Sequence, residues 1–86
     1  MEFQKETIIF LENSKERYAE ITVRFEGNNT YNIISTYVSE NHRGEGLAEK
    51  LMTEALSFIK KHNGKIKADC SYAKKYLTRK NINFEN

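Results

Sequence analysis

The spacing of apolar residues changes near the middle of this 86-residue chain, and the change falls at a junction that contains two glycines. Residues 17–26 alternate apolar and polar side chains, which is the pattern of a half-buried strand, and residues 30–38 also have a β-rich pattern. From Leu47 onward the apolar residues recur every three or four positions, as on one face of a helix. The pattern therefore predicts a sheet that passes through a glycine turn into a packed helix.

The junction itself reads Arg43-Gly44-Glu45-Gly46-Leu47-Ala48. The first N–H groups of a helix have no intrahelical partner and lie at the positive end of the helix dipole, so they bind phosphate readily. The spacing matches neither the Gly-Lys-Ser/Thr phosphate loop nor the three-glycine dinucleotide fingerprint. We expect a different phosphorylated ligand here, and an ordinary surface turn is the alternative.

The segment Arg43-x-x-Gly46-x-Ala48 resembles the acyl-CoA-binding turn of GNAT-type N-acetyltransferases. The resemblance extends over roughly residues 17–84 and includes Thr36-Tyr37-Val38 before the turn and Asp69-Cys70-Ser71-Tyr72 after the helix. In this order the segments are similar to a minimal, single-domain GNAT-like family whose members carry a Cys-Ser-Tyr/Phe segment after the last core strand.

This resemblance implies a fold and an activity. The fold is α/β (α+β) and GNAT-like, with a mainly antiparallel sheet packed by one long helix and a shorter C-terminal helix. The activity is transfer of an acyl group to an unidentified amine, with acetyl-CoA or CoA bound as the donor substrate. A non-catalytic acyl-CoA-binding or sensing module is the alternative.

The resemblance also implies which residues bind the donor. The backbone of Tyr37, Val38 and Ser39 would hydrogen-bond the pantetheine arm. Arg43 would cap the diphosphate, and glycine would let the backbone approach it closely. The N–H groups around the diphosphate would come from Gly44, Glu45, Gly46, Leu47 and Ala48.

Two catalytic mechanisms are compatible with the sequence. In the mechanism that the resemblance implies, the amine attacks the thioester directly and Tyr72 or Tyr76 protonates the departing thiolate; both tyrosines could instead be core residues. In the covalent mechanism Cys70 takes the acyl group first, because a helix N-terminus makes thiolate more available. Asp69 opposes that activation, and a lone cysteine can also pack as a small hydrophobe.

Two other residues near the turn are weaker candidates for a base. Glu40 follows the third strand and is interpreted as a solvated loop carboxylate. His42 would lie at the diphosphate end, far from the reacting sulfur, and is interpreted as turn surface or a phosphate contact.

Length and composition favour one domain, residues 1–86, with a small core. The apolar run at residues 8–11 is too short for a signal peptide or a membrane span, so we expect a cytoplasmic protein without a membrane partner. Cys70 is the only cysteine, and His42 and His62 have no ligand spacing, so we expect neither a disulfide nor a metal site.

Basic residues gather in the second half of the chain. Residues 60–80 carry eight Lys and Arg and one acidic residue, Asp69, and such a segment either steers a polyanion such as CoA or solvates the helices. Nucleic acid is not the expected partner, because Tyr72 and Tyr76 fall on the helix face that the core needs. Larger relatives line the acceptor pocket with N-terminal helices, so here that pocket would be open or completed in a homo-oligomer.

Turn residues predict how the strands connect. Asn13-Ser14-Lys15 and Gly27-Asn28-Asn29 predict two tight turns, and therefore three antiparallel strands, the first at residues 7–12. A fourth, short strand is expected around Ile66.

Other residues predict where the helices end. Gly64 is expected as the left-handed residue after the first helix, and Asp69 or Ser71 as the cap of the second. Ile82 and Phe84 are expected to dock the tail. The buried side of the second helix would consist of Tyr72, Ala73, Tyr76 and Leu77.

Overall fold

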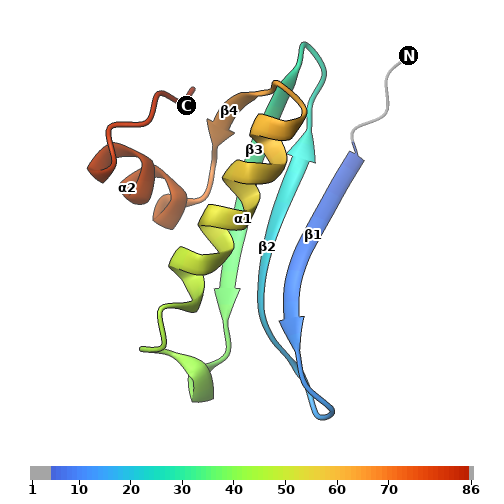
Figure 1. The fold of residues 1–86 in the computed structure, drawn as a ribbon, viewed down its shortest axis with the longest axis vertical. Coiled ribbons are helices and arrows are strands. Elements are labelled where there is room, and N and C mark those ends of the chain that lie inside the picture. Colours follow the sequence, from blue (N-terminus) through green and yellow to red (C-terminus); the bar gives the residue numbers. More distant parts are fainter. Residues whose placement is uncertain (1–4, 86) are drawn as a thin grey trace.

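The structure is a computed structural model that describes residues 5–85. These residues form a four-stranded sheet of order β1-β2-β3-β4, a long helix α1 across one face, and a shorter helix α2 beside β4 (Figure 1). The elements are β1 (Lys5–Glu12), β2 (Arg17–Phe25), β3 (Thr30–Val38), a short 3-10 helix (Glu40–His42), α1 (Leu47–Lys61), β4 (Lys65–Ala68) and α2 (Ser71–Arg79).

The first three strands are antiparallel, as predicted, and both predicted turns connect them. In the first turn the Asn13 side chain accepts the N–H groups of Lys15 and Glu16, at 2.8 and 3.0 Å. In the second turn Gly27, Asn28 and Asn29 all have positive φ, which glycine and asparagine tolerate best. The strand pattern and the turn residues therefore predicted this half of the fold correctly.

The core lies between the sheet and the two helices. Ala19, Ile21 and Val23 on β2 are buried, as the alternating pattern predicts, and they face the apolar side of α1. α1 buries Leu51, Met52, Ala55 and Ile59, and α2 buries Ala73, Tyr76 and Leu77. No helix within residues 5–85 is long and apolar enough to cross a membrane.

β4 is parallel to β3, and α1 is the crossover that such a pair requires. The pairing runs from Thr30 opposite Lys65 to Ile33 opposite Ala68. β3 continues to Val38 and stays paired with β2 to its end, whereas β4 stops at Ala68. The second half of β3 therefore has an open edge on the side where β4 would continue.

The end of α1 differs from the sequence prediction. Asn63, with φ of 53°, is the left-handed residue there, and Gly64 is not in that conformation. Gly64 is needed for another reason: a Cβ atom at this position would overlap the ring of Tyr31. Asparagine tolerates the left-handed region without a glycine, so the prediction of Gly64 in that role is wrong.

The start of α2 also differs from the prediction. Cys70 is the N-cap residue, and within the described chain no side chain caps this end. Asp69 does not cap α2, because its carboxylate is bound by Asn32 of β3. The tail docks as predicted: Ile82 and Phe84 pack against the core, and Glu85 forms a parallel bridge with Lys67 of β4.

We predict that Gly64→Ala destabilises the fold by about 1–3 kcal/mol, the usual cost of overpacking. The Tyr31 ring cannot easily move away, because it lies against Phe25 and Phe58, with ring centroids 5.0 and 5.8 Å away. Urea unfolding measures the change. Asn63→Gly is the matched control, since it relaxes the left-handed position next door, and equal stability of both variants would contradict the packing role of Gly64.

Candidate active site

A cleft of about 570 Å³ lies at the open edge of β3. Its walls come from four separate segments, which meet because β4 stops early and α1 begins beside the end of β3. The lining residues are Thr36, Tyr37 and Val38 of β3; His42, Arg43, Gly44 and Gly46 of the turn; Leu47, Ala48 and Glu49 of α1; and Tyr72 and Arg79 of α2.

The strand wall of the cleft is mostly as expected. Tyr37 and Val38 line it, and Tyr37 is one of the large exposed hydrophobic residues, at 48% exposure. Ser39 differs from these two, because it is buried and its N–H donates to the Tyr18 carbonyl at 2.7 Å. The Ser39 N–H is therefore already used, and the open strand edge ends at Val38.

The turn supplies an end of α1 without a side-chain cap. Gly46 is the N-cap residue, and the first helical bond runs from the Lys50 N–H to the Gly46 carbonyl at 3.1 Å. The N–H groups at this helix start have no intrahelical acceptor, which leaves them for a ligand. Leu47 and Ala48, which carry two of them, line the cleft as predicted.

Both glycines of the turn are required by the backbone. Gly44 and Gly46 have φ of 86° and 74°, and a Cβ atom at either position would meet no described atom within 4 Å. Crowding inside the protein therefore does not explain the glycines. They give the left-handed turn its shape and leave a flat backbone surface against the cleft.

The side chains of Arg43 and Glu45 make different contacts within the turn. Arg43 Nε donates to the Val38 carbonyl at 3.2 Å, which ties the turn to the end of β3 and leaves the terminal guanidinium nitrogens for an anion. Glu45 does not line the cleft, and its carboxylate lies 3.5 Å from His42 Nδ1. His42 lines the cleft, and its ring stacks on that of Tyr18 with the ring centroids 4.3 Å apart.

Cys70 lies behind the cleft wall. It is partly buried, and its Sγ is 3.5 Å from Oγ1 of Thr36, which lines the cleft. The predicted position at the start of α2 is correct, but Cys70 is not itself among the residues that line the cleft.

The two candidate tyrosines are separated by the fold. Their ring centroids are 6.3 Å apart, yet Tyr72 lines the cleft whereas Tyr76 is 7% exposed and belongs to the core. The Tyr76 ring is flanked instead by the cations of Arg79 and Lys80, each 5.7 Å from its centroid. Geometry therefore places Tyr72, and not Tyr76, where it can meet a ligand.

Two residues of the cleft are not indicated by any sequence motif. Glu49 lies on the polar side of the helical pattern that begins at Leu47, and Arg79 belongs to the basic segment at residues 60–80. Both line the cleft. Helical spacing could have identified Arg79, because it follows Tyr72 by nearly two full turns of α2 and so lies on the same face.

The cleft raises the pKa of Tyr72 above the ordinary value for tyrosine. Partial burial is the main cause, the negative charge of Glu49 adds to it, and the Arg79 guanidinium opposes it. The phenol is protonated throughout the neutral range, as in an ordinary tyrosine, and the shift moves its ionisation to still higher pH.

The other polar residues that the sequence suggested have different surroundings. Lys67 Nζ is held by Glu26 at 3.2 Å, so it is not a free cation, whereas Lys74, Lys75 and Arg79 surround a shallow hollow on α2. Among residues 5–85 no group of three His, Cys, Asp or Glu side chains is arranged to hold a metal ion. Glu40 is exposed in the 3-10 helix and lies outside the cleft.

Comparisons with known proteins identify the family. The model of the GCN5-related N-acetyltransferase family matches residues 7–85, so the chain belongs to that family. The solution structure of a GCN5-like protein from Staphylococcus aureus is 35% identical, with a TM-score of 0.72, and the match covers 86% of this chain and 74% of that one. The family and the GNAT-like fold that the sequence predicted are confirmed.

A crystal structure of an acetyltransferase from Bacillus cereus ATCC 14579 has the same fold, with a TM-score of 0.65 at 18% identity. The match covers 73% of this chain, which spans 46% of the length of that protein. A comparison with curated proteins gives no match.

We predict that ionisation of Tyr72 destabilises the protein at high pH. Because the pKa is raised in the folded state, the folded protein holds this proton more tightly than the unfolded chain. The stabilisation is complete below roughly pH 10 and is lost as pH rises through the folded-state pKa. Between pH 8 and pH 11 the free energy of unfolding should fall more steeply for the wild type than for Tyr72→Phe. Parallel curves for the two proteins would contradict the raised pKa of Tyr72.

Proposed function

We propose that this protein binds acetyl-CoA in the cleft and transfers the acetyl group to an amine. Membership of the GCN5-related N-acetyltransferase family supports the reaction class. One observation carries the assignment of the site: the open edge of β3 and the uncapped start of α1 face a single cleft. An extended arm that ends in a phosphate group suits both features at once.

The donor would lie with its diphosphate on the turn. The N–H groups at residues 44–48 and the Arg43 guanidinium would neutralise the diphosphate charge. The pantetheine amides would pair with the Val38 N–H and the backbone of Thr36, as an added strand pairs with an open sheet edge. Backbone groups of successive strand residues point to opposite sides, and the bond from the Ser39 N–H to Tyr18 places those of Tyr37 on the β2 side. The thioester would then lie toward Thr36 and Tyr72, at the end of the cleft formed by α2.

The chemistry needs little beyond this placement. The neutral amine attacks the thioester carbonyl, the C–S bond breaks, and the CoA sulfur leaves as a thiolate. Tyr72 donates its phenolic proton to that thiolate, the proton lost from the attacking nitrogen passes to solvent, and the Tyr72 phenolate regains a proton from solvent. Tyr72 is suited to this role by its place in the cleft, where its phenol is protonated at neutral pH as in any tyrosine.

A covalent route through Cys70 is the competing mechanism. Its thiol would give up a proton and take the acetyl group, which exchanges one thioester for another, and the amine would then attack the acetylated cysteine. Cys70 is separated from the cleft by the wall that includes Thr36, so we favour direct attack.

A binding module without turnover is the second candidate function. β1 and β2 are joined by the short turn after Glu12, so within the described residues no helix between these strands walls an acceptor pocket. Acetyl transfer to a panel of amines separates the two functions, because a binding module would bind CoA and acetylate none of them.

Gly46→Val should abolish measurable CoA binding while the protein stays folded. The new side chain would fill the space in front of the helix start, where the structure has no other atom within 4 Å. The backbone strain at φ of 74° costs stability as well, so Asn28→Val is the matched control: it places the same residue at φ of 49° in the distant hairpin turn. Calorimetry with parallel circular dichroism measures both. Normal CoA affinity in a folded Gly46→Val protein would contradict the diphosphate site.

Cys70→Ala should keep most of the transfer activity and lose about 1 kcal/mol of stability, as expected for one small buried group. Tyr72→Phe should lower kcat about a hundredfold, because a general acid is removed. Incubation with acetyl-CoA alone should leave no hydroxylamine-labile acetyl group on the peptide that contains Cys70. Such a label, together with an inactive Cys70→Ala and an inactive Cys70→Ser, would instead establish the covalent route.

A further inference from the structure

Asn32 is a fully buried polar residue near the start of β3, on the sheet face opposite α1. It lies opposite Arg24 of β2 and Lys67 of β4, so its side chain is surrounded by charged groups of both neighbouring strands. Burial of an amide is costly unless its hydrogen bonds are made. The hydrogen-bond partners of Asn32 therefore determine whether its burial is tolerated.

Two of its three side-chain bonds go to the same residue, Asp69. Asn32 Oδ1 accepts the Asp69 N–H at 3.0 Å, and Nδ2 donates to Asp69 Oδ2 at 2.9 Å. Nδ2 also donates to Glu26 Oε2 at 2.7 Å. The backbone N–H needs an acceptor and the carboxylates need a donor, so the amide can take only one orientation.

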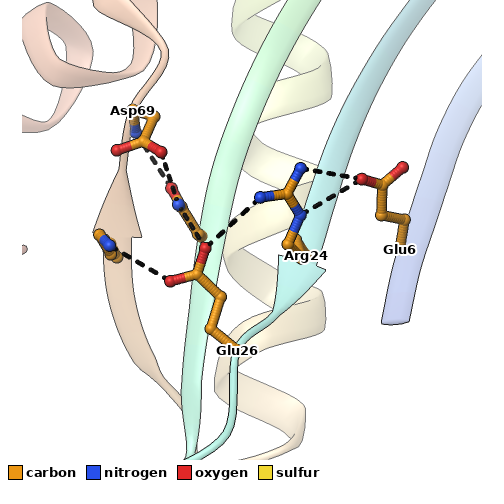
Figure 2. Close-up of polar contacts among 6 residues, drawn as sticks. Glu6, Arg24, Glu26 and Asp69 are labelled. Atoms are coloured by element: carbon orange, nitrogen blue, oxygen red, sulfur yellow. Dashed lines mark hydrogen bonds and ion pairs between the residues drawn. The ribbon is translucent and has the colours of Figure 1, made fainter. Parts of the chain in front are cut away.

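The rest of the network keeps Glu26 in place (Figure 2). Lys67 donates to Glu26 Oε1 at 3.2 Å, and Arg24 lies 3.9 Å from Oε2 while it also binds Glu6. The pKa of Glu26 is lowered, chiefly by the bond from Asn32 and further by Lys67, so the carboxylate is charged at neutral pH. Figure 2 shows this row of polar groups across the sheet, with the helix behind the strands.

Asp69 is the point where β4 leaves the sheet. The last pair of the parallel ladder joins Ile33 and Ala68, and α2 begins at Ser71. Between them the N–H groups of Asp69 and Cys70 both donate to the Ile33 carbonyl, at 3.1 and 3.0 Å. Together with the Asn32 bonds, these contacts attach the start of α2 to β3.

We propose that Asn32 is a positioning residue for acetyl transfer: by holding Asp69 it sets where β4 separates from β3 and where Tyr72 stands in the cleft. The inference rests on the proposed function. None of the side-chain hydrogen-bond partners of Asn32 lines the cleft. Asn32 therefore acts on the cleft only through the chain at residues 69–72.

Asn32→Asp tests this directly. The substitution keeps the shape and the acceptor but turns the Nδ2 donor into a charged oxygen that faces the carboxylates of Glu26 and Asp69. Amide hydrogen exchange, measured without any donor, should become roughly tenfold faster at Asp69 and Cys70, the effect of about one lost hydrogen bond. The kcat for acetyl transfer should fall roughly tenfold to a hundredfold, as expected for misplacement of a reacting group.

The KM for acetyl-CoA should change much less than kcat, because the turn at residues 44–48 is untouched. Asp69→Asn is the conservative variant and should behave as the wild type, since it keeps both the acceptor and the backbone N–H. Asp69→Ala should change hydrogen exchange and kcat in the same way as Asn32→Asp. Because Asp69 is exposed, we expect Asp69→Ala to fold even if Asn32→Asp does not. Arg24→Gln, at the other end of the network, is the matched control and should change neither measurement.

Unchanged exchange at residues 69 and 70 in Asn32→Asp, or in Asp69→Ala if the first variant does not fold, would overturn the proposal. So would faster exchange with an unchanged kcat, or an equal loss of kcat in Arg24→Gln. A wild type that binds CoA without transferring acetyl would overturn the proposed reaction; the exchange measurement would still decide whether Asn32 holds the start of α2.

Discussion

The Ile33 carbonyl accepts two backbone N–H groups, from Asp69 and Cys70, at the place where the parallel strands β3 and β4 stop pairing. The cleft exists because of this early divergence: β3 runs on to Val38 with one open edge, and α2 turns away to form the opposite wall. The crossover that a parallel pair requires places the start of α1 at the same open edge. The two features that we propose hold the donor arm and its phosphate group therefore lie in one place.

Charge and proton state fit this arrangement. Burial and Glu49 raise the pKa of Tyr72, so the phenol on the α2 side of the cleft is protonated well beyond neutral pH. On the opposite sheet face the pKa of Glu26 is lowered, so the network that holds Asp69 stays charged over the same pH range. Tyr72 and the contacts of Asp69 are therefore both in the charge state that the proposed reaction needs at neutral pH.

Local patterns allowed most of the fold to be predicted. Alternation in β2, asparagine and glycine in the hairpin turns, and helical spacing from Leu47 are properties of neighbouring residues, and the spacing of Arg43 and Gly46 indicated the family. Contacts between distant residues could not be predicted in this way. Asp69 looked like a helix cap because nothing local shows that Asn32, thirty-seven positions earlier, binds it. Nor does spacing along a helix show that Tyr72 meets the cleft while Tyr76 meets the core.

An NMR titration of the amide resonances with CoA tests the central claim most directly, because it reports each part of the cleft separately. The account predicts that CoA shifts the amides of Thr36, Tyr37 and Val38 on β3 together with those of the turn from Gly44 to Ala48, and leaves β1 unchanged. Shifts confined to the basic hollow around Lys74 and Lys75, or an unperturbed β3 edge at saturation, would contradict the claim that the diverging strands and the start of α1 form one donor site.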